Sequence, residues 1–444
     1  MKNIFLAALM CALFTYCSTP DTSSLRNQYD KAYTHFENGN YTGSLALLIE
    51  VIANSKKSSS HNLIGDSHYL IAYNFKKLYH PDSALKSLYE ARDSYILADN
   101  ETQEAVITNE IGILLMESRA FLLAEEYYEE ALKLAEDRDN KYLISNGKYN
   151  LGLCLRKMGD YLEAYYNYHQ SLGIELDMDI PMGDYWTSID LIELSIERPS
   201  YVADILLEQG ICKFKQGNLH AASGLFWQVV KIAEKYALSK KMGQAYNRNG
   251  DCKLALGEVD SSKIYYLYAL DLFANEPKEQ TQVYSNLGKA HLISGEYTAA
   301  IDYYELAIHG DITSTDLDDA KVACDSLKEF FKNKNDLTNA LLISEKRISF
   351  DDIAQDIKRR VKKANKSQYA ISAMYMQLDR KIRLEKQASI NNLIYASGIL
   401  FIILTLASIW YNRKKKSSFS YSTNTSTWKI NEVKEKIKKD KSKI

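Results

Sequence analysis

Small residues recur along this chain in one local context, at intervals of about 40 residues, a period typical of stacked helical repeats. They are Ala32, Ala72, Gly112, Gly152, Gly210, Gly250 and Gly288. A second small residue follows each of them by twelve positions, and a leucine or an aromatic residue follows that one by four (Leu48, Leu88, Tyr128, Tyr168, Phe226, Tyr266 and Tyr304). Residues four apart lie on one face of a helix. The pattern therefore predicts repeated pairs of helices, in which each small residue admits the close approach of the facing helix.

A turn separates the two helices of each predicted pair. Seven positions after the first small residue, five units carry a glycine: Gly39, Gly159, Gly217, Gly257 and Gly295. Glycine commonly ends a helix because it accepts the left-handed backbone conformation at the C-terminus. One such pair cannot cover its own apolar face, so the pairs have to stack on one another. Only five prolines occur in the chain, which also favours a helical protein.

The repeat resembles the tetratricopeptide repeat (TPR). Two copies are clearest. One reads Tyr149-Asn150-Leu151-Gly152, with Gly159-Asp160-Tyr161 and Ala164 following, and the other reads Ser285-Asn286-Leu287-Gly288, with Gly295-Glu296-Tyr297 and Ala300 following. Seven units occur over residues 25–310 and a degenerate eighth near 325–349, so we expect a solenoid over 25–350. The resemblance implies an all-α, TPR-type solenoid, here followed by a long helical stalk and one transmembrane helix. The wider spacing between Gly152 and Gly210 indicates an insertion at about 173–200, either a tolerated loop or a docking element bearing Trp186.

Both ends of the chain carry membrane signals. Residues 1–17 read as an export signal: Lys2 precedes an apolar run that is too short to span a bilayer. Cys17 resembles the lipidated cysteine of bacterial lipoproteins, although Tyr16 stands where a small residue is usual. Ordinary signal cleavage and an uncleaved anchor are the alternatives to lipidation.

Residues 391–411 predict a transmembrane helix, because Leu393 to Trp410 contains no charge. Four basic residues, Arg413 to Lys416, follow at once, and positive charge marks the cytoplasmic side. We therefore expect a single-pass protein of the bacterial inner membrane, with residues 18–390 in the periplasm and 412–444 in the cytoplasm. Residues 351–390 predict a helical stalk. Its apolar stripe, which includes Ile371 and Met374, suits either a coiled-coil dimer or packing on the last repeat.

Charge is divided unevenly between these parts. The whole chain has a formal net charge of -2, whereas residues 412–444 carry +8. That balance excludes a globally basic nucleic-acid binder, and we expect no nucleic-acid partner. The basic tail suits an electrostatic anchor to anionic lipid, with contact to a partner or to nucleic acid as the alternative, although so short a segment would bind DNA only weakly by itself.

The chain carries none of the motifs expected of an enzyme. Cys154, Cys212 and Cys252 occupy one slot of the repeat, in helices too far apart for a disulfide, and are predicted to be small packing residues. No metal-ligand spacing, phosphate-binding glycine loop or nucleophile elbow occurs in the sequence. We predict no catalytic, cofactor-binding or metal-binding residues.

The resemblance implies a protein or peptide ligand on the concave surface, which the first helix of each unit lines. The side chains expected there are Asn150, Arg156, Asn247, Asp251, Asn286 and Lys289. The order of the segments resembles bacterial membrane-anchored TPR sensors and regulators, without their cytoplasmic output domain. A sensor or adaptor of a signalling system is the leading hypothesis. A static scaffold for an envelope complex and a truncated regulator are the alternatives.

Overall fold

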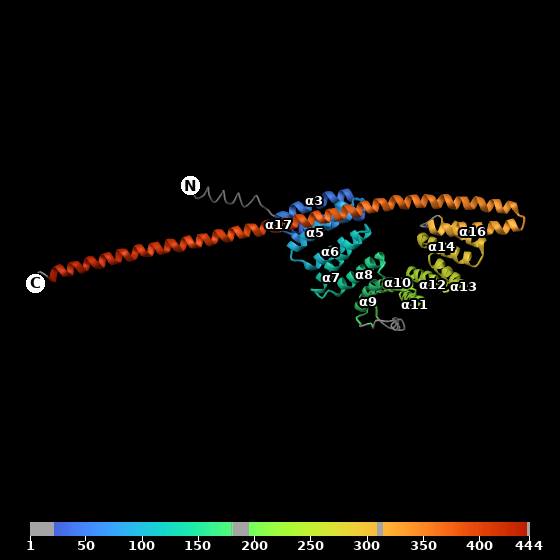
Figure 1. Ribbon diagram of the computed structural model, residues 1–444, viewed down its shortest axis with the longest axis horizontal. Helices are drawn as coiled ribbons and strands as arrows, with labels where there is room; N and C mark the ends of the chain where they lie inside the picture. Colours follow the sequence, from blue (N-terminus) through green and yellow to red (C-terminus); the bar gives the residue numbers. More distant parts are fainter. Residues whose placement is uncertain (1–21, 179, 181–194, 309–313, 442–444) are drawn as a thin grey trace. The chain divides into compact units, whose positions relative to one another are not determined.

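The computed structural model describes residues 22–178, 180, 195–308 and 314–441. The expected export signal, Cys17 and Trp186 lie outside these residues. Every regular element in the described part of the chain is a helix, and consecutive helices pack on one another from α2 to α16 (Figure 1). The predicted all-α solenoid is therefore confirmed.

The helices alternate between the first and the second member of each pair. The first helices are α2 (Thr22–Glu37), α4 (His61–Lys77), α6 (Glu101–Glu117), α8 (Lys141–Met158), α10 (Pro199–Lys215), α12 (Ser239–Ala255), α14 (Pro277–Ile293) and α16 (Ser314–Asn333). The second helices are α3 (Tyr41–Lys57), α5 (Pro81–Leu97), α7 (Phe121–Glu136), α9 (Tyr161–Leu176), α11 (Leu219–Lys235), α13 (Val259–Leu272), α15 (Tyr297–Ala307) and the start of α17 (Leu337–Lys441). We number these pairs as units one to eight.

The turns inside the pairs use the predicted backbone geometry. Gly159 ends α8 with a φ of 95°, and Asp160 then caps α9 by accepting a hydrogen bond from the backbone N–H of Glu163. In units two and three the same turn position holds Tyr79 and Arg119, which also adopt a positive φ. The turn thus keeps its shape even where the sequence lacks the glycine.

In most units, an aromatic ring of the second helix packs against a glycine of the first helix. A β-carbon added to Gly112 would lie 2.7 Å from the ring of Tyr128, and one added to Gly250 would lie 2.4 Å from the ring of Tyr266. The same contact pairs Gly152 with Tyr168, Gly210 with Phe226 and Gly288 with Tyr304. These five rings are almost wholly buried. The five glycines among the small residues predicted from spacing therefore each receive an aromatic ring from the second helix of their own unit, whereas the first two units have Leu48 and Leu88 at the matching position.

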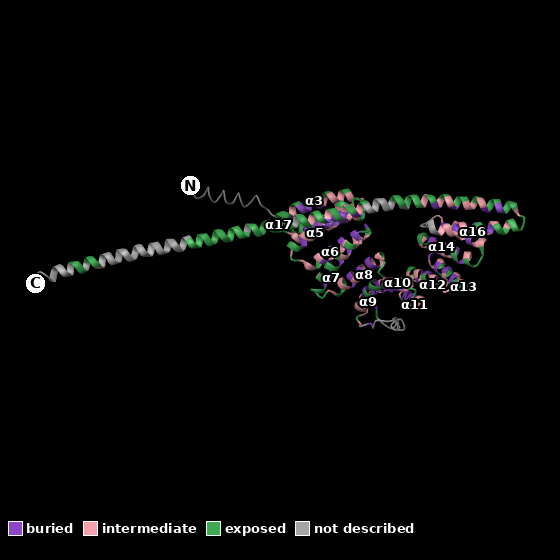
Figure 2. Ribbon diagram, in the orientation of Figure 1, coloured by how far each residue is buried: buried purple, intermediate pink, exposed green. Residues whose placement is uncertain are grey.

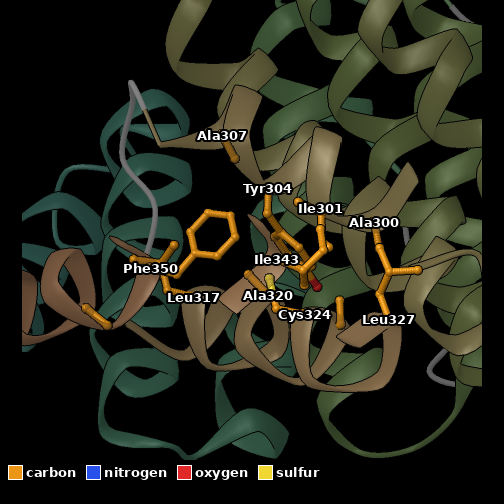
Figure 3. Packing of buried hydrophobic residues seen from close by; sticks show 12 residues of the cluster. Ala300, Ile301, Tyr304, Ala307, Leu317, Ala320, Cys324, Leu327, Ile343 and Phe350 are labelled. Carbon is orange, nitrogen blue, oxygen red and sulfur yellow. The ribbon is translucent and has the colours of Figure 1, made fainter. Parts of the chain in front are cut away.

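The last units share one core. Tyr304 and Ile301 of α15 meet Leu317, Cys324 and the neighbouring alanines of α16, and the first turns of α17 add Ile343 and Phe350 (Figure 3). Helix α16 and the start of α17 thus pack as a further pair on α15. Lys328 stands where the other units carry a small residue, seven positions before Asn335 at the turn.

The described ends of the insertion are tied to the solenoid. The Nε2 atom of His169 lies 2.8 Å from the carbonyl oxygen of Ile180, and the backbone N–H of Ile196 donates to the Tyr236 hydroxyl. Arg198 pairs with Glu175 and stacks its guanidinium over the ring of Tyr201. The chain therefore leaves and re-enters the stack of helices at fixed points.

Residues 377–444 form a second unit, which is described here by itself. Within it α17 continues as one helix to Lys441. The segment Ile390–Ile409 has a mean hydropathy of 2.0, none of it is buried, and it is long enough to cross a bilayer (Figure 2). By length and composition this segment suits the membrane helix expected at 391–411.

Candidate functional site

The six side chains predicted to bind a ligand all lie on first helices. Asn150 and Arg156 belong to α8, Asn247 and Asp251 to α12, and Asn286 and Lys289 to α14. The structure brings the last four together and leaves the first two nearer the middle of the solenoid. The six residues therefore fall into two groups with different surroundings.

Polar pairs connect the first helices of successive units. The Asn150 side chain donates a hydrogen bond to the Oδ1 atom of Asn109 at 2.9 Å, and Asn286 donates to the Oδ1 atom of Asn247 at the same distance. Tyr73 donates likewise to Glu110 at 3.1 Å. An asparagine can bond a peptide backbone through both its donor and its acceptor, but part of that capacity here already links one unit to the next.

Arg156 is paired across the insertion. Its guanidinium lies 2.6 Å from Glu208 of α10, and the two side chains are only 19% and 17% exposed. Burial raises the pKa of Glu208 although Arg156 and Arg248 oppose that rise. A buried ion pair of this kind holds two helices in one register more than it adds stability. Arg156 thus faces Glu208 instead of an open surface.

The second group lines an open pocket of about 380 Å³ on the first helices of units five to seven. Three cations, Lys215, Arg248 and Lys289, lie at this pocket together with one carboxylate, Asp251. Its apolar lining comes from side chains of both helix types: Ile211, Phe214, Phe226, Leu254, Tyr266 and Ile293. The pocket therefore offers net positive charge beside an apolar wall.

Asp251 organises the polar side of the pocket. Its carboxylate accepts hydrogen bonds from the Tyr266 hydroxyl at 3.0 Å and from Asn286 at 3.1 Å, and Arg248 lies 3.0 Å away. Burial raises the pKa of Asp251, and the charge of Arg248 opposes that rise. Asn286 donates to both Asp251 and Asn247, so both hydrogens of its amide nitrogen are engaged. The cations, with Arg248 44% exposed, are the groups available to a ligand.

Arg248 and Lys215 were not among the predicted residues. Arg248 lies two positions before Gly250, as Asn150 lies before Gly152 and Asn286 before Gly288. The repeat register alone could have found it. Lys215 lies at the end of α10, outside that slot, and no sequence signal marks it.

The buried thiols behave as predicted from their repeat slot. Cys154, Cys212 and Cys252 are fully buried and unpaired, and burial raises the pKa of each to about 12. Among the described residues, no three His, Cys, Asp or Glu side chains are grouped so as to hold a metal ion.

A larger pocket, of about 740 Å³, lies beside the start of the insertion, between residues of α7, α8 and α9. Lys141 and Asp177 form an ion pair at its edge, 2.6 Å apart, and Ile180 closes one side. None of the six predicted residues lies there, and both of its lysines are already paired, Lys141 with Asp177 and Lys148 with Glu136. We therefore take the smaller pocket as the candidate site.

Comparisons with known proteins agree with this architecture. No protein-family model matches the chain, and no curated protein is significantly similar to it in sequence. Among solved structures, a STAND protein with a tetratricopeptide repeat sensor, from Pyrococcus horikoshii, superposes with a TM-score of 0.50 at 14% identity. That match covers 77% of this chain and 50% of the other. The chain has the tetratricopeptide-repeat fold. The apo form of RapI is also similar, with a TM-score of 0.49 at 14% identity. That match covers 69% of the present chain and 99% of RapI.

Proposed function

We propose that this TPR protein is an interaction module that binds a protein or peptide segment on the first helices of units five to seven. The observation that carries the proposal is the pocket in which Lys215, Arg248 and Lys289 lie around one carboxylate, Asp251, beside an apolar wall. Asp251 is already bonded to Arg248, Tyr266 and Asn286. Such a surface suits a segment that carries acidic side chains next to a large apolar one, because charge complementarity selects the partner and apolar burial holds it.

The second part of the proposal concerns the location of the protein in the cell. An export signal at residues 1–17 and the apolar segment Ile390–Ile409, followed by Arg413 and three lysines, support a periplasmic solenoid on a single membrane anchor. In that setting the module acts as a sensor or adaptor that reports an envelope ligand. Lipidation of Cys17 is testable apart from the rest: incorporation of labelled lipid should disappear in a Cys17→Ala variant.

A static scaffold is the second candidate function. The pairs Arg156–Glu208 and Asn150–Asn109 fix neighbouring units to each other along the same face. A surface stiffened in this way suits the permanent assembly of an envelope complex. A scaffold and a sensor differ in whether bound ligand changes the shape of the solenoid.

The ligand pocket is tested with the full chain in detergent and an array of synthetic peptides that vary in acidic and apolar content. We expect acidic peptides with an apolar residue to bind, and the Arg248→Glu/Lys289→Glu variant to bind them at least about tenfold more weakly. The control variant is Lys86→Glu/Lys133→Glu, which makes the same charge change at two exposed lysines of second helices. Equal losses in both variants, or none in the pocket variant, would exclude this pocket as the binding site.

Charge reversal is preferable to replacing the asparagines. Because Asn150, Asn247 and Asn286 bond across unit boundaries, a triple alanine variant would also loosen the solenoid. A loss of binding in that variant would not separate ligand contact from altered shape.

A further inference from the structure

Helix α17 is anchored first in the last repeat. Phe350 and Ala354 are buried against α15 and α16. Ion pairs surround this contact: Lys346 lies 2.8 Å from Glu305, and Arg347 lies 2.7 Å from Asp325. This first docking point fixes the direction in which α17 leaves the eighth unit.

The same helix has a second buried stretch several turns later, still within the unit that ends at Met376. Ser372 is 5% exposed and Tyr375 is fully buried, whereas Ala370, Ala373 and Met376 are exposed. A lone helix cannot bury a tyrosine by itself, so one face of this stretch has to be covered by another part of the same unit. The burial falls on the side of the helix where the sequence has the stripe residues Ile371 and Met374, which are both half-buried.

The groups that interact electrostatically with the buried Tyr375 hydroxyl identify the covering surface. They are Ser118 and Glu117, at the end of α6, and Asp82, at the start of α5. Burial raises the pKa of Tyr375, the two carboxylates raise it further, and Ser118 opposes that rise. Ser118 is itself buried, and its hydroxyl donates to the carbonyl oxygen of Leu114. These residues lie at the edge of units two and three, not on the last repeat.

We propose that residues 371–376 of α17 are a latch that closes the solenoid on itself, by docking Tyr375 on the edge formed by the start of α5 and the end of α6. From Phe350 to Tyr375 the helix advances about 37 Å at 1.5 Å per residue. A helix held at both ends is a stiff bar between unit eight and units two and three. It therefore fixes the summed angle between the intervening units, which include the pocket of units five to seven.

The latch has a consequence for any partner that requires a different curvature. Such a partner has to release Tyr375, and the release frees the stretch of α17 that leads to the apolar segment after Gln377. The inference does not depend on the ligand proposed above, because the latch is a contact of the chain with itself. It also adds a third interpretation of the stripe, in which Ile371 and Met374 flank a contact with units two and three.

Photocrosslinking tests the contact directly. The full chain in detergent carries p-benzoylphenylalanine in place of Tyr375 or, as the matched control, in place of the exposed Met376. We expect position 375, and not position 376, to crosslink to residues 79–84 or 115–120 of the same chain. Mixing isotopically heavy and light protein before irradiation distinguishes contacts within a chain from those between chains. Crosslinks between chains, crosslinks to other segments only, or none from position 375 would overturn the proposal.

Limited trypsin digestion tests whether the contact holds the bar in place. Lys358, Arg359, Arg360, Lys362 and Lys363 are exposed between the two docking points. Cleavage of a native protein follows the population of locally opened states. We expect Tyr375→Ala to raise the rate of cleavage at these residues about tenfold, and Tyr375→Phe, which keeps the buried ring, to leave the rate near that of the wild type. Equal rates in all three proteins would show that Tyr375 does not restrain α17.

Discussion

The first helices of units four and five and those of units six and seven carry polar residues at equivalent repeat positions. These residues have different roles in the two stretches. Two positions before the small residue, unit five has Glu208, which pairs with the half-buried Arg156, whereas unit six has Arg248, which lies at an open pocket. The Arg156–Glu208 pair closes the surface between units four and five. Between units six and seven the asparagine pair and Asp251 leave Arg248 and Lys289 beside the cavity. The comparison teaches that a repeat slot fixes the place of a side chain, and that the neighbouring unit decides whether the side chain is structural or available to a ligand.

The largest effect on stability should come from replacing Arg156, and the matched replacement of Arg248 should affect binding instead. Arg156→Met leaves Glu208 buried without its partner, so we expect a loss of about 3 kcal/mol in the free energy of unfolding. Arg248→Met, at a side chain 44% exposed, should change stability by less than about 1 kcal/mol and weaken peptide binding instead. Urea unfolding and the peptide array measure the two quantities.

The double variant Arg156→Met/Glu208→Leu is the control for the buried pair. With both charges removed, we expect stability to return close to that of the wild type, because a buried ion pair adds little over apolar side chains of similar volume. Equal destabilisation by Arg156→Met and Arg248→Met would remove the distinction between the two stretches.

A smaller effect concerns the rings beneath the two stretches. Gly152→Ala and Gly250→Ala each drive a β-carbon into a ring, of Tyr168 and Tyr266 respectively, at 2.7 and 2.4 Å. We expect both to destabilise the protein by about 2 kcal/mol in urea unfolding. Because Tyr266 lines the pocket and donates to Asp251, only Gly250→Ala should also weaken peptide binding. Loss of binding in Gly152→Ala would indicate that the two stretches are coupled.

The smallest predicted effect is a pH dependence. Without Arg156, burial holds the pKa of Glu208 in the folded state further above its ordinary value of 4.5. The folded state of Arg156→Met then takes up a proton at a higher pH than the unfolded state does, so acidification favours folding at this site. We expect the stability difference from wild type to shrink by about 1 kcal/mol between pH 7 and pH 5. An unchanged difference would show that Glu208 is not the source of the destabilisation.

Much of the fold could be predicted because the decisive contacts lie within one unit. The same separation in sequence joins Gly112 to Tyr128 and Gly152 to Tyr168, so the repeat itself shows which residues face each other. The turn at Gly159 and the packing role of the cysteines follow from local rules in the same way.

The site could be predicted only in part, because its contacts cross unit boundaries. The partner of Arg156 is Glu208, which lies beyond the insertion, so the regular period of the repeat does not relate them. The docking of Tyr375 near Ser118 depends on how far the whole stack turns, a quantity summed over many small angles between units. No local pattern in the sequence records that sum.

The placement of each ring on a glycine of its own unit bears on how such a chain can change in length over generations. The ring and its glycine lie close together in the sequence, so they would be copied or deleted together whenever one whole repeat is gained or lost. A duplicated repeat would therefore already contain both the aromatic ring and the glycine that packs against it. New layers could therefore join this protein without correlated changes elsewhere in its interior, and only the surfaces between layers would need to adapt.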